Sequence, residues 1–304
     1  INNKINKFYD KAYGKKHILH NLEHIKWQFK NNPFYKGSNF SLVVIEDDNE
    51  VKSHLGFIPI ELKILNKTID AIWHVSFYTL KEFRGKKLGT KTIELSNTYG
   101  ELSMVLSGSE GTKKIYTNMN GKDLGLLNRH IRILNKNNLE KYSNKKINIK
   151  NISICNSNVG KFNRVKNLNL KYKGFWNIVK KRYPITVNRT EEYLNWRYFK
   201  HPIIDYHFME FVVNDELKGF AVIRLEDNNK EVKAARLVDI ICEKAFNIDI
   251  FNHIITYCKN KVDFIDFFCT GKFYQEGLED TGFIKDDKNE LKIPTVFYPI
   301  DFNR

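Results

Sequence analysis

The sequence has few cysteines, and their spacing does not suit a metal site. The chain of 304 residues contains four of them: Cys155, Cys242, Cys258 and Cys269. No two form a C-x-x-C pair, and no histidine stands at zinc-finger spacing from them. We therefore expect neither a structural metal ion nor a disulfide scaffold.

Long apolar runs are also missing. The run Leu42–Ile45 stops after a few residues, well short of the ~20 that a membrane-spanning helix needs. We also expect no secretory signal, because the first residues do not have the pattern of one. The sequence predicts a soluble, cytoplasmic protein with no membrane association.

Hydrophobic, aromatic and basic residues are all plentiful. Hydrophobic residues make up 42% of the chain and aromatic residues 13%, so burial can offset the entropy lost on ordering, and a disordered chain is excluded. The length fits one large domain or two of about 150 residues. The formal net charge of +15 either keeps the surface solvated or suits a polyanionic ligand, such as nucleic acid, a phosphate-rich cofactor or a nucleotide-activated substrate.

Residues 24–80 and 193–243 share a spacing that indicates a tandem duplication. Trp27 and Pro33 are six residues apart, as are Trp196 and Pro202. Both copies continue with an apolar strand pattern, an acidic turn and a Gly-Phe pair. From there they align without a gap, and the matched pairs are Gly56 with Gly219, Leu62 with Leu225, Ala71 with Ala234, and Val75 with Val238.

Each copy predicts a helix, a meander of three strands, a second helix and a further strand. In the first copy these last five elements are expected near 40–46, 53–62, 71–79, 89–99 and 102–106. In the second they are expected at 207–213, 217–225, 235–242, 247–260 and 264–268. The Asn/Lys-rich stretch between the copies predicts a first domain of residues 1–140, a connecting segment of residues 141–185 and a second domain of residues 186–304.

The strongest chemical signal lies where the strand 71–79 leads into Lys81-Glu-Phe-Arg-Gly-Lys-Lys-Leu-Gly-Thr90. A glycine-containing turn at a helix start exposes unpaired N–H groups beside the positive end of the helix dipole, which favours phosphate. Arg84, Lys86 and Lys87 add positive charge. The spacing fits neither the Rossmann fingerprint nor the Walker pattern, so neither type of nucleotide site is expected.

Together, the strand, the turn and the helix resemble the acyl-CoA pyrophosphate motif of the GNAT acyltransferase superfamily, Q/R-x-x-G-x-G/A. Arg84 stands at its first position and Gly89 at its last. Lys87 stands where the middle glycine usually is, and a side chain there crowds the pyrophosphate if the backbone needs an unusual φ. The second copy has no such turn, since residues 243–250 contain no glycine.

The resemblance implies an α/β (α+β) protein made of two tandem GNAT-like domains, each with a mixed, mostly antiparallel central sheet flanked by helices. It also implies one acyl-CoA site, in the first domain, and no metal. The implied cofactor-binding residues are Phe77, Thr79, Arg84, Gly85, Lys86, Lys87, Leu88, Gly89 and Thr90.

GNAT domains usually carry a tyrosine after the fifth strand, where it protonates the departing thiolate. Tyr116 resembles that residue. The alternative is a ring packed under the sheet with its hydroxyl in water, as expected for Tyr274, its counterpart in the second copy. The family also implies that a backbone N–H near Phe77–Thr79 polarises the thioester carbonyl.

His74 is our preferred base for the attacking amine, because the pKa of histidine needs little adjustment near neutral pH. A structural role for this histidine is the alternative. The substitutes for the base are Glu61, Asp70, Glu110 or a water molecule.

Two groups of tandem GNAT proteins suggest an acceptor. One acylates nucleotide-linked amino sugars destined for surface polysaccharide such as lipopolysaccharide O-antigen. The other comprises peptidoglycan-bridge aminoacyltransferases, which use aminoacyl-tRNA. The turn Arg84–Gly89 favours the first group, since a tRNA-dependent enzyme needs no pantetheine-pyrophosphate site, and a tandem duplication is compatible with a monomer.

The segment Leu194–Tyr198, followed by His201 and Pro202, resembles a segment of such polysaccharide-linked proteins. This resemblance implies that Arg197 and His201 bind substrate; a structural corner of Trp and Arg is the alternative.

A contrasting class is a non-catalytic nucleic-acid-binding protein on the same scaffold. The rings in Lys171–Trp176 would then stack on bases between basic side chains. The phosphate turn makes nucleic acid the less favoured partner.

Overall fold

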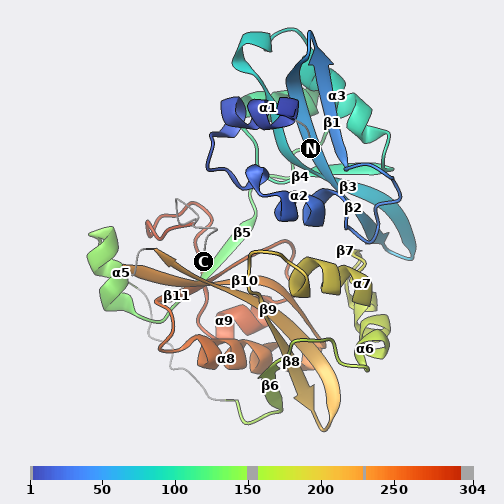
Figure 1. Ribbon diagram of the computed structural model, residues 1–304. Coiled ribbons are helices and arrows are strands. Elements are labelled where there is room, and N and C mark those ends of the chain that lie inside the picture. Colours follow the sequence, from blue (N-terminus) through green and yellow to red (C-terminus); the bar gives the residue numbers. More distant parts are fainter. Residues whose placement is uncertain (1–2, 149–156, 229–230, 296–304) are drawn as a thin grey trace. The chain divides into compact units, whose positions relative to one another are not determined.

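The computed structural model describes residues 3–148, 157–228 and 231–295 (Figure 1). These residues form two compact units, each built from two segments of the chain. Unit 1 comprises the described residues within 1–124 and 180–203, and unit 2 those within 125–179 and 204–304. Residues 125–140 therefore belong with unit 2 and residues 186–203 with unit 1, unlike the continuous domains expected from the sequence.

The described residues of unit 1 form a five-stranded mixed sheet. Its strands are β1 (Leu42–Asp47), β2 (Glu50–Ile64), β3 (Lys67–Thr79) and β4 (Leu102–Val105), in that order, with β7 (Ile185–Val187) paired to β2. All pairs are antiparallel except β3 with β4, which is parallel. The turn between β1 and β2 has left-handed φ at Asp48 and Asn49, as a two-residue hairpin requires.

The helices of unit 1 are α1 (Asn3–Tyr13), α2 (Leu22–Phe29), α3 (Leu88–Asn97), α4 (Glu110–Asn118) and α7 (Glu191–Leu194), which continues into a π-helical turn at Asn195–Phe199. Short 3₁₀ turns cover Ile18–His20, Lys81–Phe83 and Lys180–Arg182. In α1 the residues Ile5, Phe8, Tyr9 and Ala12 recur at helical spacing and pack together in the core.

The described residues of unit 2 form a seven-stranded sheet in the order β12-β5-β11-β10-β9-β8-β6. Its strands are β5 (Asn128–Ile133), β6 (Lys161–Arg164), β8 (His207–Val213), β9 (Glu216–Asn228), β10 (Val232–Cys242), β11 (Phe264–Cys269) and β12 (Ile284–Lys285). The helices are α5 (Lys136–Ser143), α6 (Tyr172–Val179), α8 (Asn247–Cys258) and α9 (Gln275–Asp280), with a 3₁₀ turn at Lys244–Phe246.

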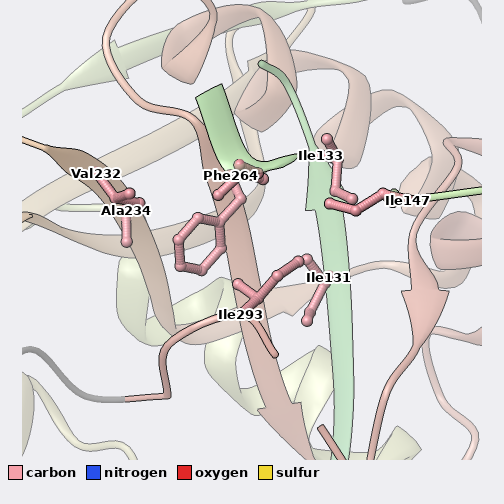
Figure 2. Packing of buried hydrophobic residues seen from close by; sticks show 8 residues of the cluster. Ile131, Ile133, Ile147, Val232, Ala234, Phe264 and Ile293 are labelled. Atoms are coloured by element: carbon pink, nitrogen blue, oxygen red, sulfur yellow. The ribbon is translucent and has the colours of Figure 1, made fainter. Parts of the chain in front are cut away.

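Part of the core of unit 2 lies between segments far apart in the sequence (Figure 2). Ile131 and Ile133 of β5 pack with Phe264 of β11, with Ala234 of β10 and with Ile293. On the same strand the buried Arg129 guanidinium lies 3.1 Å from the Asp266 carboxylate and donates to the carbonyls of Ile293 and Pro294. Strand β5 is therefore an integral part of unit 2.

Two sheets with mixed, mostly antiparallel pairing and flanking helices confirm the fold class expected from the sequence. Both sheets also follow the same order: a three-strand meander, a 3₁₀ turn, a helix and a parallel strand. Ala71 lies opposite the first residue of β4, and Ala234 opposite the first residue of β11.

The expected match of Gly56 with Gly219 is wrong. Gly56 is the seventh residue of β2, whereas Gly219 is only the fourth of β9, and both strands follow equivalent left-handed turns. The same offset of three positions separates Leu62, the thirteenth residue of β2, from Leu225, the tenth of β9, so the gap-free alignment fails along this strand.

The ring-rich segment Lys171–Trp176 does not offer stacking surfaces. Tyr172, Phe175 and Trp176 lie in or at the start of α6 and are at most 5% exposed. The base-stacking role considered for them is therefore wrong, because they pack in the core. Tyr274 is likewise buried and donates its hydroxyl to the Ile240 carbonyl.

None of the described helices combines the length and apolar character needed to cross a membrane.

Candidate functional site

A cavity of about 1090 Å³ in unit 1 begins where two strands part. The parallel pairing of β3 with β4 extends only from Ala71 opposite Leu102 to His74 opposite Val105. Strand β3 continues to Thr79, so within the described chain its last five residues have no strand partner on that side. Residues 73–79 of β3 line the cavity, together with the end of β4 and residues from α4 and from the α7 region.

Most of the residues expected to bind a cofactor line this cavity. They are Phe77, Thr79, Arg84, Gly85, Lys87, Leu88, Gly89 and Thr90; Lys86 is not among the lining residues. The sequence therefore identified one wall of the cavity, and the role of these residues stays a prediction.

The turn before α3 has the shape of an anion-binding loop. Gly85 has φ 81, and Lys87 adopts a left-handed conformation with φ 58 and ψ 12 just before the helix begins at Leu88. In the described part of the chain, the backbone N–H groups from Lys87 to Thr90 have no hydrogen-bond acceptor. Several donors thus lie at the positive end of the helix dipole.

Lys87 departs from the family pattern at the point where the backbone is unusual. A left-handed conformation costs a non-glycine residue roughly 1–2 kcal/mol, and the turn adopts it nevertheless. The Lys87 side chain is exposed. The side chain therefore adds a positive charge at the cavity rim without changing the backbone path.

The start of α3 is held close to β3. A Cβ atom on Gly89 would lie 3.0 Å from Phe77 Cζ and 3.3 Å from Thr79 Oγ1. The buried Thr92 hydroxyl lies 2.8 Å from both Ser53 Oγ and the Leu88 carbonyl, and Ser53 Oγ lies 2.9 Å from Thr79 Oγ1. These contacts tie the first turn of the helix to β2 and β3. Sequence reasoning missed Ser53 and Thr92.

Arg84 stands at the entrance to this turn. Its Nε donates to the Thr79 carbonyl at 3.2 Å, and its guanidinium lies over the Tyr78 ring, 5.2 Å from the centroid. Both contacts are made by the guanidinium group, and the side chain remains exposed. An exposed guanidinium held in this way suits a phosphate.

The structure brings His74 and Tyr116 together. His74 is 3% exposed and lines the cavity, and its Nδ1 lies 2.8 Å from Tyr116 Oη. Its Nε2 lies 2.9 Å from Ser96 Oγ, while the Ser96 hydroxyl donates to the Ile93 carbonyl at 2.8 Å. Because the single Ser96 hydrogen is used in this way, Nε2 must be the donor, and Nδ1 accepts from Tyr116.

Burial sets the protonation of this pair. Desolvation lowers the pKa of His74 to about 4 and raises the pKa of Tyr116 above its ordinary value. At neutral pH the imidazole is therefore neutral and the phenol keeps its proton. Tyr116 follows Ile115, a lining residue of α4, but is not itself among the lining residues.

Ser96 was missed by the sequence analysis, although a signal exists. Thr92 and Ser96 are four residues apart and, with Ile93, form the buried face of α3. Small hydroxyl side chains at helical spacing on a buried face indicate a polar contact inside the protein.

The substitutes for the base lie outside the cavity. Glu61 Oε2 accepts from the Asn188 amide, Asp70 forms an ion pair with Lys36 at 3.0 Å, and Glu110 is in the first turn of α4. None of the three is a lining residue of this cavity. The geometry thus favours His74 over the other side chains.

Arg197 lines the cavity, whereas His201 does not. The Arg197 guanidinium lies 5.6 Å from the centroid of the Trp27 ring, and the His201 ring lies 4.1 Å from the same ring. Trp27 and Trp196 stack at 5.1 Å, and each indole N–H donates to the other's carbonyl at 2.7 Å. The two tryptophans of the sequence repeat are therefore reciprocal partners within unit 1.

No group of three or more His, Cys, Asp or Glu side chains among the described residues is arranged to hold a metal ion.

The sequence matches no protein-family model and no curated protein. Its fold is similar to that of solved structures at low identity. A GCN5-related N-acetyltransferase from Anabaena variabilis is 12% identical with a TM-score of 0.57, over 81% of this chain and 60% of that one. An N-myristoyltransferase from Saccharomyces cerevisiae, solved with bound myristoyl-CoA, is 12% identical with a TM-score of 0.55, over 93% and 73%.

A third structure, a conserved protein of unknown function from Enterococcus faecalis described as a probable N-acyltransferase, is 10% identical with a TM-score of 0.54 over 80% and 59%. The chain thus spans about 60% of the length of two of these proteins. At this identity the likeness shows that the chain shares the fold of these proteins.

Proposed function

We propose that this protein is an acyl-CoA-dependent N-acyltransferase. The observation that carries the proposal is the convergence on one cavity of an unpaired strand end, a helix start with free N–H groups and the hydrogen-bonded pair of His74 and Tyr116. An acyl-CoA offers a diphosphate, a thin pantetheine arm and a thioester, and each matches one part of this cavity.

The diphosphate binds at the turn before α3. The N–H groups of Lys87 to Thr90 lie at the start of the helix, where its dipole is positive. Arg84 supplies a guanidinium beside them. Backbone donors hold an anion without the entropic cost of ordering long side chains.

The pantetheine arm and thioester lie along the unpaired end of β3. Backbone groups of Phe77–Thr79 face a gap in the sheet instead of a strand. A free N–H there is a donor for the thioester oxygen as negative charge develops on it.

Tyr116 and His74 together carry the amine proton to the thiolate. As the neutral amine attacks the carbonyl carbon, the C–N bond forms, and the amine proton passes to Tyr116 Oη while the phenolic proton moves to His74 Nδ1. As the C–S bond breaks, His74 returns its proton to Tyr116, and Tyr116 protonates the thiolate. The amine proton ends on sulfur and the pair is restored.

We further propose that the acceptor is a nucleotide-linked amino sugar for surface polysaccharide. Arg197 lines the cavity with Trp73, Tyr193 and Trp196. Aromatic faces suit a sugar ring, and the guanidinium suits a carboxylate or phosphate.

Isothermal titration with acetyl-CoA and longer acyl-CoA thioesters tests the proposal. We expect binding to the wild-type protein and about tenfold weaker binding to Arg84→Ala. Lys36→Ala, which removes an exposed charge outside the cavity, is the matched control and is expected to bind as the wild type does. If no acyl-CoA binds, the proposal is wrong.

Mass spectrometry with a panel of nucleotide-linked amino sugars identifies the acceptor. The expected product carries the mass of the acyl group on the sugar. Transfer only from aminoacyl-tRNA, or binding of oligonucleotides without any acyl-CoA, would instead establish one of the two alternatives raised by the sequence.

A further inference from the structure

A buried polar cluster lies behind the unpaired end of β3. It consists of Tyr9 and Tyr13 from α1, His54 from β2 and the backbone carbonyl of Ser76 in β3. Tyr9 and His54 have 0% exposure. The three side chains do not line the cavity, and the proton exchange described above does not use them.

The hydrogen bonds of the cluster converge on one carbonyl. Tyr13 Oη donates to the Ser76 oxygen at 2.7 Å, and His54 Nδ1 lies 3.0 Å from the same oxygen. Because a carbonyl only accepts, Nδ1 carries the proton, and Nε2 accepts from Tyr9 Oη at 3.1 Å. Burial lowers the pKa of His54 to about 4, so the neutral ring keeps this arrangement.

The carbonyl belongs to a strained β-bulge. Between the pairs His54 with Tyr78 and Gly56 with Val75, the β2–β3 register shifts, so that β3 carries an extra residue. Ser76 has φ 53, which costs a non-glycine residue roughly 1–2 kcal/mol. Two donors on its carbonyl offset that strain and fix the bulge in one conformation.

The direction of the carbonyl determines the direction of the next N–H. Tyr13 comes from α1, and the His54 ring packs against Phe8 and Tyr9 of the same helix, so the Ser76 oxygen faces α1. In a planar trans peptide the C=O and the following N–H point in opposite directions. The N–H of Phe77 therefore points away from α1, and Phe77 itself is a lining residue of the cavity.

We propose that His54 and Tyr13, supported by Tyr9, are positioning residues that hold the Phe77 N–H in place as the donor to the thioester oxygen. This inference rests on the proposed acyl transfer, in which a backbone N–H of this strand end is the donor, and adds to it the side chains that orient that donor. None of the three side chains contacts the substrate; they act through the Ser76–Phe77 peptide.

The Ser76–Phe77 peptide can be observed by itself, because Ser-Phe occurs once in the sequence. Labelling serine with carbonyl ¹³C and phenylalanine with ¹⁵N leaves one NMR signal that links the two labels. In the free protein, Tyr13→Phe is expected to shift the Ser76 carbonyl resonance toward the value of a carbonyl that accepts one hydrogen bond fewer. Tyr257→Phe removes a hydroxyl that lies 2.7 Å from His207 Nδ1 in unit 2, and is expected to leave the signal in place.

Adding acyl-CoA to the wild type is expected to move the Phe77 amide proton downfield, as a new hydrogen bond does. In Tyr13→Phe this downfield shift should be smaller when the same fraction of the protein has acyl-CoA bound. In kinetics, we expect kcat to fall about tenfold with KM for acyl-CoA within twofold, since loss of a whole oxyanion donor costs about 10²–10³. Tyr13→Phe removes one oxygen from a partly exposed ring; His54→Gln, which replaces a fully buried ring, is the second variant.

The outcomes separate the two proposals. If the wild type binds and transfers an acyl group but Tyr13→Phe keeps full kcat and an unshifted Ser76 carbonyl, the positioning role is wrong and the enzymatic one stands. If the carbonyl shifts but acyl-CoA leaves the Phe77 amide unmoved, Phe77 is not the donor. If the wild type binds no acyl-CoA, both proposals fail.

Discussion

At the scale of single residues, the position of one hydrogen decides what His74 can do. Ser96 gives its hydrogen to the Ile93 carbonyl, so Nε2 of His74 is a donor and only Nδ1 can receive a proton. That nitrogen is engaged with Tyr116. In the proposed mechanism, Tyr116 therefore exchanges protons with the reacting atoms, and His74 acts through Tyr116.

Tyr116→Phe is predicted to lower kcat by about 100-fold, within the range typical of general acid–base groups. The affinity for acyl-CoA should stay within twofold, because the phenol is not part of the diphosphate site. Steady-state kinetics and titration measure both quantities. Tyr99→Phe, at an exposed ring, is the control, and full activity of Tyr116→Phe would remove this residue from the mechanism.

Lys87 permits a test of backbone conformation apart from charge. Lys87→Gly and Lys87→Val both remove the ammonium group, but only valine resists a φ of 58. We predict at least tenfold weaker acyl-CoA binding for Lys87→Val than for Lys87→Gly, measured by titration. Equal affinities would mean that the left-handed turn is not needed for binding.

Sequence reasoning at this scale found residues that lie in a motif and missed those that support it. Arg84 and Gly89 follow from the spacing of the turn, and His74 from its place on the strand that leads there. Ser53, His54 and Tyr13 carry no motif, because they reach the site from other elements through contacts distant in sequence. Only the folded chain identifies them.

At the scale of elements, the approach of α3 to β3 controls the phosphate turn. The helix starts where Gly89 leaves room for Phe77 and Thr79, and the Thr92 hydroxyl fixes its first turn. The direction of the free N–H groups depends on this contact. A shift of a few tenths of an ångström moves all of them together.

Gly89→Ala is predicted to weaken acyl-CoA binding about tenfold while changing kcat at saturation less than twofold. Its Cβ would meet Phe77 Cζ at 3.0 Å, so the helix start must move. Gly100→Ala introduces similar crowding against Ile72 and Ala71, away from the turn, and should leave binding unchanged. Equal losses in both variants would point to general destabilisation.

The sequence predicted the strands and helices of both copies well, because apolar periodicity and turn residues are local signals. Helix α3 begins at Leu88, next to the expected Gly89, and β4 spans most of the expected strand 102–106. The neighbour of each strand was harder to foresee. That β5 pairs with β11 depends on contacts more than 130 residues apart.

At the scale of the whole molecule, two buried histidines and the half-buried His24 make unit 1 sensitive to acid. Burial lowers the pKa values of His24, His54 and His74 to about 4 each, while an unfolded histidine has a pKa of about 6.5. The unfolded chain therefore binds more protons below pH 6.5, and stability falls as the pH drops from there toward 4.

Between pH 7 and pH 5 we predict a loss of about 2 kcal/mol in the free energy of unfolding for each of these histidines. Urea unfolding followed by tryptophan fluorescence measures it, since Trp27, Trp73 and Trp196 lie in unit 1. His24→Gln should reduce the loss by about one third of the histidine contribution. A pH-independent free energy of unfolding over this range would contradict the burial argument.

The duplication and its domain boundaries stay proposals. The common order of elements in the two sheets and the reciprocal pair of Trp27 and Trp196 support an ancestral tandem repeat. Within that proposal, residues 1–140 and 186–304 are the descendants of the two copies, although the folded units are not built from them alone.

The exchange of β5 and β7 also limits how this gene can be divided. A break at residue 140 separates β7 from the sheet it joins in unit 1, and the same break deprives β11 of β5. Each fragment would lack a strand of its own sheet, so we expect the cavity-bearing half not to fold as a separate piece.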